Sequence, residues 1–154
     1  MKAASIKQPW ASLIAHGIKD IENRTWATKY RGTIYIHASA KFAGDINNIF
    51  TDDQWEAMGE DMRSSMVIKD FPFGAIIGKV DIVDCVINHP SIWAEKSYHN
   101  VTVNSLPFGE ENEPDYIIYN WVLANPVLFD EPILNVKGKL SLWEFEGKET
   151  KGNG

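Results

Sequence analysis

The sequence predicts one α+β domain built on a strongly curved or closed β-sheet. The chain has 154 residues, of which 44% are hydrophobic, and this suits a single core. Most apolar residues fall in short runs typical of strands, whereas helical spacing is confined to one short early segment and one acidic insertion. We therefore expect a single domain over residues 1–146. Residues 147–154 contain no core-forming residue and predict a disordered tail.

The first third of the chain alternates between strand and helix signals. Residues 1–7 predict a short strand, and residues 8–17 predict an amphipathic helix with a proline in its first turn and a glycine just past its end. Residues 18–26 alternate in the manner of a strand. After a turn at residues 30–32, the β-rich segment 33–38 predicts another strand.

The middle of the chain carries a helical insertion and the strongest strand signal. Residues 43–66 are acidic with apolar positions at helical spacing, which predicts one or two surface helices covering one side of the sheet. Residues 75–87 predict a long strand with a bulge at Gly78. Residues 89–114 are polar and weakly patterned and predict a long excursion. The remaining strands are expected at residues 116–123, 133–136 and 140–145, with Pro126 and Pro132 as breaks.

The charge is polarised along the chain. The formal net charge is −6, yet residues 1–41 hold seven Lys and Arg against two acidic residues, which leaves −11 on the remainder. A basic face on an acidic body suits a defined anionic ligand better than indiscriminate coating of nucleic acid. The alternative is that folding mixes the two segments into an even surface.

Several common classes of protein have no support in the sequence. Cys85 is the only cysteine, so one chain forms neither an internal disulfide nor a cysteine-based zinc site. No two histidines have ligand spacing, and no nucleotide-hydrolase, metalloprotease or α/β-hydrolase motif is present, so we expect no metal and no cofactor. No apolar run is long enough for a membrane span and no leader is recognisable, which predicts a cytoplasmic protein without membrane contact.

A set of short motifs resembles the ASCH family, within the PUA-like superfamily, and in particular the ASCH domain of a transcription coactivator. The motifs are Gln8–Ser12, Gly17–Lys19, Glu22–Trp26, Arg31–Gly32 leading into His37–Ser39, Gly74–Cys85, Asn125–Pro126, Lys137–Gly138 and Leu142–Trp143. The resemblance implies a PUA-like mixed β-barrel, or pseudobarrel, with a cleft between the first helix, the strand after it and the neighbouring strands. It fits least well in the helical insertion and in residues 89–114.

The residues of this implied cleft have chemistry suited to a nucleotide. Cationic donors suit phosphate, tryptophan rings offer surfaces on which a base stacks, and side-chain amides pair with a base edge. The predicted ligand-binding residues are Gln8, Trp10, Lys19, Glu22, Arg24, Trp26, His37, Ser39, Lys41 and Asn125. Each also has a structural interpretation: core packing for the tryptophans and His37, an ion pair for the charged residues, and capping of a helix or turn for Gln8 and Asn125.

The same motif leaves an enzymatic alternative open. Some similar ASCH proteins are amidohydrolases of acylated cytidine whose motif places a Lys, a Thr three residues later and then an Arg. Here these positions are Lys19, Glu22 and Arg24, so a carboxylate replaces the nucleophilic hydroxyl. Glu22 retains the chemistry to activate a water as general base, with Lys19 or Arg24 stabilising an oxyanion.

The sequence thus predicts a regulatory module that binds nucleic acid, single-stranded or locally opened RNA or DNA, or a nucleotide. The first alternative is a hydrolase of a modified nucleoside or of RNA, with Lys19 and Glu22 as candidate catalytic residues. The second alternative is a protein-interaction domain.

Overall fold

A single curled sheet organises the computed structural model, which describes residues 1–98 and 115–147. Its described strands are β1 (Lys2–Gln8), β2 (Ile21–Arg24), β3 (Gly32–Phe42), β4 (Ala75–Val86), β5 (Tyr119–Ile133) and β6 (Leu142–Glu144). They lie side by side in the order β2-β5-β4-β3-β1-β6. β1 is parallel to β3, and the other neighbours are antiparallel. This mixed sheet confirms the predicted α+β class.

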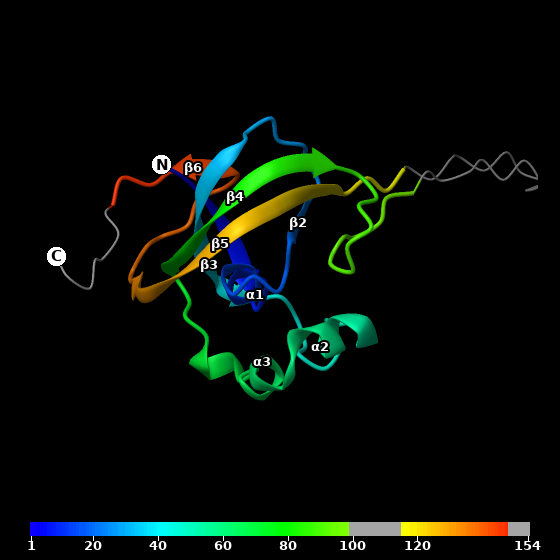
Figure 1. Ribbon diagram of the computed structural model, residues 1–154. Coiled ribbons are helices and arrows are strands. Elements are labelled where there is room, and N and C mark those ends of the chain that lie inside the picture. Colours follow the sequence, from blue (N-terminus) through cyan, green and yellow to red (C-terminus); the bar gives the residue numbers. More distant parts are fainter. Residues whose placement is uncertain (99–114, 148–154) are drawn as a thin grey trace, which may run out of the picture.

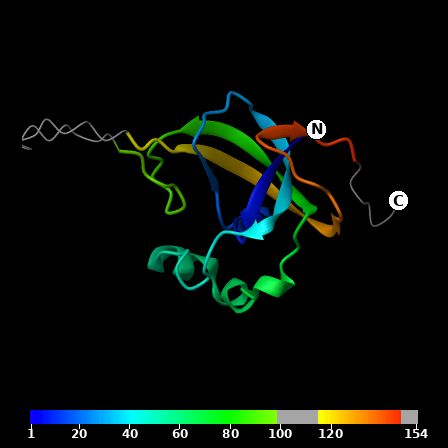
Figure 2. The ribbon, with the colours of Figure 1, turned by 180° about the vertical axis from the view of Figure 1, so that it is seen from behind.

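The sheet curls until its ends approach one another, but it does not close (Figures 1 and 2). β6 pairs with β1 only at residues Lys2 to Ala4. Beyond that point β1 faces β2, which is the first strand in the sheet order. We call this gap, between Ser5–Lys7 of β1 and Glu22–Arg24 of β2, the seam. Arg24 crosses it, because its Nη2 donates a hydrogen bond to the Ser5 carbonyl at 2.9 Å.

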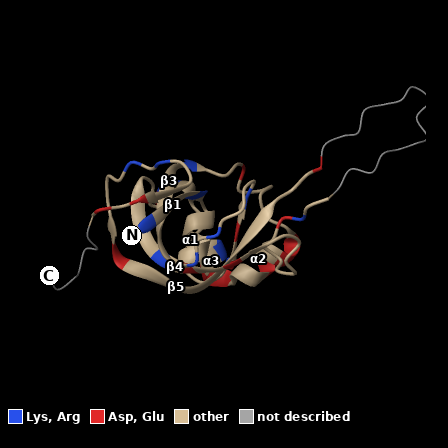
Figure 3. Cartoon of the chain, turned by 90° about the horizontal axis from the view of Figure 1, so that it is seen from above, with Lys and Arg blue, Asp and Glu red and all other residues tan. Residues whose placement is uncertain are grey.

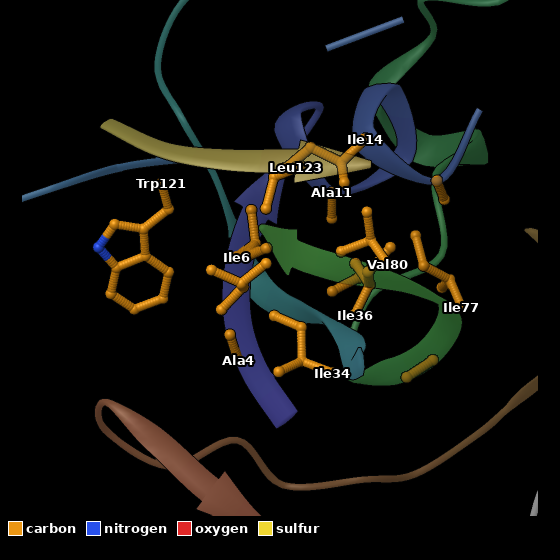
Figure 4. Packing of buried hydrophobic residues seen from close by; sticks show 14 residues of the cluster. Ala4, Ile6, Ala11, Ile14, Ile34, Ile36, Ile77, Val80, Trp121 and Leu123 are labelled. Carbon is orange, nitrogen blue, oxygen red and sulfur yellow. The ribbon is translucent and has the colours of Figure 1, made fainter. Parts of the chain in front are cut away.

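The interior of the curled sheet is filled by aliphatic side chains and plugged by helix α1 (Trp10–Ala15). Figure 4 shows Ala11 and Ile14 of this helix above Ile36 and Val80 of the sheet. The buried Gln8 caps the helix, since its Oε1 accepts a hydrogen bond from the Ser12 amide at 3.0 Å. The predicted strand 1–7 and helix 8–17 are both confirmed.

The acidic insertion forms α2 (Asp52–Met58), α3 (Glu60–Ser64) and the short 3₁₀ helix η1 (Ile68–Asp70). A capping box between Thr51 and Gln54 starts α2. The helices were expected to cover one side of the sheet, and this was wrong. They lie below one end of the curled sheet (Figure 1), where Met58 packs with Leu13 of α1 and with Trp93. The apolar spacing predicts a buried face but not the element that buries it.

β5 is longer than the sequence predicted. It runs through both Pro126 and Pro132 to Ile133, so the expected break and the separate strand at residues 133–136 were wrong. The pairing with β4 shifts register between Ile76 and Gly78, where a proline without an amide donor is tolerated. The predicted bulge at Gly78 is confirmed. A Cβ there would lie 2.2 Å from the Val127 carbonyl oxygen, so only glycine fits.

The start of the predicted polar excursion is folded rather than extended into solvent. Trp93 is buried at 4% exposure. The backbones of Tyr98 and Tyr116 exchange two hydrogen bonds, and their rings stack at 5.2 Å. Residues 99–114 of the excursion, and all of the predicted disordered tail except Gly147, lie outside the described residues.

The separation of basic and acidic residues along the sequence is partly retained in the folded protein. Seen from above, Lys and Arg residues gather around β1, β3 and the loop before β3, while Asp and Glu residues gather on α2 and α3 (Figure 3). Arg63 is the only basic residue within those two helices. None of the described helices has the length and apolar character needed to cross a bilayer.

Candidate functional site

Two adjoining hollows open along the seam. The inner cavity has a volume of about 140 Å³, and the outer groove has about 280 Å³. Trp10, Glu22 and Asn23 line both. The inner cavity adds Lys19, Ile49, Gln54, Trp93 and Glu95, and the outer groove adds Ser5, Ile6, Lys7 and Arg24. The two hollows therefore share one wall and together form the candidate site.

The shared wall is fixed by an ion pair on β2. Arg24 holds Oε2 of Glu22 with its Nε at 2.9 Å and its Nη2 at 2.7 Å. The Glu22 side chain is 10% exposed and that of Arg24 is 20% exposed. The guanidinium also lies over the ring of Trp121, 5.5 Å from its centroid. Nη1 of Arg24 has no hydrogen-bond partner among the described residues, so it remains available to a ligand in the outer groove.

Lys19 is buried in the wall of the inner cavity. The chain wraps around the end of α1, where the Lys19 amide donates to the Leu13 carbonyl at 3.1 Å. Its Nζ donates a hydrogen bond to the Ile21 carbonyl and lies 3.9 Å from Oε1 of Glu22. Burial lowers the pKa of Lys19, although the neighbouring carboxylates of Glu22 and Glu95 oppose this shift. The amine donates hydrogen bonds whether or not it carries the additional proton.

The opposite wall comes from the loop at residues 88–98. Asn23 on β2 binds this loop twice, donating to the Trp93 carbonyl and accepting from the Glu95 amide, each at 3.0 Å. The fully buried Asn120 on β5 donates to Oδ1 of Asn23 at 2.9 Å and to the Glu95 carbonyl at 3.1 Å. This network places Trp93 and the exposed Glu95 side chain at the cavity. The sequence interpretation missed both, and a tryptophan within a polar stretch was the available signal.

Trp10 separates the inner cavity from the outer groove. Its ring makes edge contacts with Phe50 at 5.2 Å and with Trp93 at 6.4 Å, and Nζ of Lys19 lies 5.6 Å from its centroid. The residue is half-buried and packs against both adjacent core clusters. The sequence left two interpretations of Trp10 open, packing in the core and a ring surface at the cleft. The structure combines both in this one side chain.

Three of the predicted ligand-binding residues are engaged in contacts within the protein: Gln8 and His37 are buried, and Trp26 is partly buried. Gln8 is fully buried and donates its Nε2 to the Pro72 carbonyl at 2.9 Å. His37 is 1% exposed and bonded to Ser5 Oγ and the Val136 carbonyl, and burial lowers its pKa. Trp26 packs on Trp121, with ring centroids 4.6 Å apart. None of the three lines either hollow of the seam.

The other predicted residues lie elsewhere on the surface. Ser39 and Lys41 occupy the last residues of β3, where Ser39 Oγ accepts from the Lys41 amide at 3.3 Å. Asn125 is exposed on β5 and donates to Asp81 Oδ2 at 3.0 Å. The structure thus brings together Trp10, Lys19, Glu22 and Arg24 and leaves the remaining candidates apart. Within residues 1–98 and 115–147, no three His, Cys, Asp or Glu side chains gather in a metal-binding group.

The curled mixed sheet, the helical plug and the cleft at the seam define a PUA-like pseudobarrel domain. The ASCH domain family matches residues 5–133, from the first residue of the seam to the end of β5, and the chain belongs to this family. It is similar to activating signal cointegrator 1 of Homo sapiens and of Mus musculus, each 26% identical over 151 residues. The match covers 96% of this chain and 23% of each relative, so the chain spans about a quarter of the length of these curated relatives.

Breaking the ion pair at the seam should destabilise the fold. Arg24→Gln leaves the Glu22 carboxylate buried without its fork, and we expect a loss of on the order of 3 kcal/mol in the free energy of unfolding. Urea denaturation of Arg24→Gln, Glu22→Gln and the double variant measures this loss and a coupling of about 1–3 kcal/mol. Arg31→Gln breaks an exposed pair with Asp84 and serves as the control, with at most about 1 kcal/mol expected. Strictly additive losses would contradict the assigned pair.

Proposed function

We propose that this ASCH domain binds nucleic acid, single-stranded or locally opened, or a nucleotide, through the seam. A base enters the inner cavity and the adjoining phosphate lies in the outer groove. The observation that carries the proposal is the pairing of free cationic donors with an aromatic-walled cavity on the two sides of Trp10. This juxtaposition matches the two chemical parts of a nucleotide.

The outer groove supplies the phosphate contacts. The Lys7 side chain is exposed at its rim and has no ion-pair partner among the described residues. Nη1 of Arg24 faces no described acceptor, while the rest of its guanidinium is held rigidly by Glu22 and Ser5. A preorganised guanidinium and a mobile ammonium together suit one or two phosphates rather than a long stretch of backbone.

The inner cavity supplies the base contact. The inner cavity, at about 140 Å³, has half the volume of the outer groove, at about 280 Å³, and we assign the compact planar base to the cavity and the phosphate to the groove. The half-buried Trp10 provides the aromatic surface, while the buried Trp93 packs edge-on against it, and base stacking on such a ring contributes about 1–3 kcal/mol and tolerates any base. A base must leave a duplex to reach this depth, which favours single-stranded or opened substrates.

Affinity for a short single-stranded RNA should decrease with salt on a shallow slope, because few phosphates are contacted. Lys7→Ala should weaken binding and reduce the slope of log affinity against log salt by about one contact. Lys69→Ala, which changes an exposed lysine of η1 away from the seam, is the matched control and should leave both unchanged. Fluorescence titration at several salt concentrations measures the slope. Equal behaviour of the two variants would refute the phosphate assignment.

The hydrolase alternative has one observation in its favour, the buried Lys19 amine beside the Glu22 and Glu95 carboxylates. Against it, no Ser, Thr or Cys is present among the described residues that line the inner cavity. An acyl-enzyme route requires such a nucleophile. Binding therefore remains the proposed activity.

The wild-type protein should not deacylate N4-acetylcytidine above background, because Glu22 stands where similar hydrolases place the nucleophilic hydroxyl. Chromatographic detection of released cytidine measures the rate. Glu22→Thr restores the hydroxyl and is the informative companion variant. Robust wild-type turnover that disappears in Glu22→Gln would show that a carboxylate base does the chemistry and would replace the binding proposal with a hydrolase.

A further inference from the structure

The hydrogen-bonding groups of the inner cavity allow the base to be specified further, an inference that rests on the function proposed above. We propose that the inner cavity selects guanine, with Lys19 donating to its O6 and the carboxylates of Glu22 and Glu95 accepting from its N1–H and N2 amino group. The ligand is thus a guanine nucleotide, free or within a single strand.

The two side-chain amides that line the cavity are each held by the protein at both their oxygen and their nitrogen. The side-chain oxygen of Asn23 accepts hydrogen bonds from the Glu95 amide and from the Asn120 side chain. Its side-chain nitrogen donates one to the Trp93 carbonyl. Gln54 accepts from the Thr51 amide and donates to the Ile92 carbonyl at 2.8 Å. These bonds fix both amides in the wall of the cavity, and we assign recognition of the base edge to the charged side chains.

Those charged side chains offer one donor and two acceptors. Oε2 of Glu22 is taken by Arg24, but its Oε1 is bound only loosely, 3.9 Å from Nζ of Lys19. The Glu95 side chain is exposed at the cavity and has no partner among the described residues. Lys19, Glu22 and Glu95 all line the cavity, and both carboxylates raise the pKa of Lys19 against the lowering by burial. The cavity therefore presents an amine together with two carboxylates.

Guanine has the matching edge. Its Watson–Crick side carries one acceptor, O6, followed by two donors, N1–H and the N2 amino group. Cytosine and adenine each offer a single donor group beside a ring-nitrogen acceptor, which would face a carboxylate. Uracil offers one N–H between two carbonyl oxygens, so one oxygen can accept from Lys19 but the other would meet a carboxylate. A base that leaves the buried Lys19 amine or Glu22 carboxylate unpaired is rejected, whereas the exposed Glu95 adds affinity for a base with a second donor.

Binding of GMP, IMP, AMP, CMP and UMP to the full chain, measured by calorimetry at low salt, tests the proposal. IMP differs from GMP only by the missing N2 amino group. Since a hydrogen bond to a charged acceptor contributes about 1.5–3 kcal/mol, GMP should bind about ten- to a hundredfold more tightly than IMP. A short uridine oligonucleotide with one central guanosine, compared with the all-uridine strand and with GMP, shows whether the strand or the free nucleotide is preferred.

Glu95→Gln should remove most of the preference for GMP over IMP, and because the side chain is exposed this change should not unfold the domain. Glu56→Gln, an exposed carboxylate on α2, is the control and should retain the preference. Equal affinity for all five nucleotides would overturn the guanine assignment and leave the proposed function intact. Absence of binding to every nucleotide and both oligonucleotides would overturn the proposed function itself.

Discussion

The ion pair between Glu22 and Arg24 occupies the place where the described sheet fails to close, and the rest of the site depends on it. Arg24 spans the gap to the Ser5 carbonyl, so a side chain takes the part that backbone pairing plays elsewhere in the sheet. A carboxylate with so little exposure is costly unless it is paired, and the guanidinium fork satisfies it while the proposed phosphate contact uses the remaining nitrogen, Nη1. In the proposed function, the residues that bridge the open edge of the sheet are thus also those that meet the ligand.

The inner cavity is a composite of segments far apart in the chain. β2 supplies the ion pair, α1 supplies Trp10, and the loop at residues 88–98 supplies Trp93 and Glu95. The loop is held by buried amide hydrogen bonds from Asn23 and Asn120, which are directional and leave little freedom to the wall they fix. The cavity is thus largely preformed, as expected of a site that binds a small rigid group.

The sequence predicted the positions of the helices and strands better than it predicted which of them pack or pair with one another. Periodicity located β1, α1, β3 and β4, because alternation and helical spacing report which face of a segment is buried. It did not show that β5 continues through two prolines, since that depends on register shifts against β4, nor that α2 and α3 pack on α1.

In the site, Trp10, Lys19, Glu22 and Arg24 were near in sequence and were found together. Gln8 and His37 had suitable chemistry, but their hydrogen bonds are consumed internally, and Glu95 lies 72 residues from the Asn23 that positions its backbone. The spacing of residues along a chain shows neither which polar side chains are already hydrogen-bonded inside the protein nor which distant segments come together.

The proposed function requires that the seam be the binding surface of this ASCH domain. Amide NMR spectra recorded during titration with a short single-stranded RNA containing guanosine provide the test, because every described backbone amide reports separately. We expect the largest shifts at Ser5–Lys7, Glu22–Arg24 and Trp93–Glu95, and we expect them to saturate together. Shifts confined to the end of β3, to Asn125 or to the acidic helices, with the seam unchanged, would contradict it.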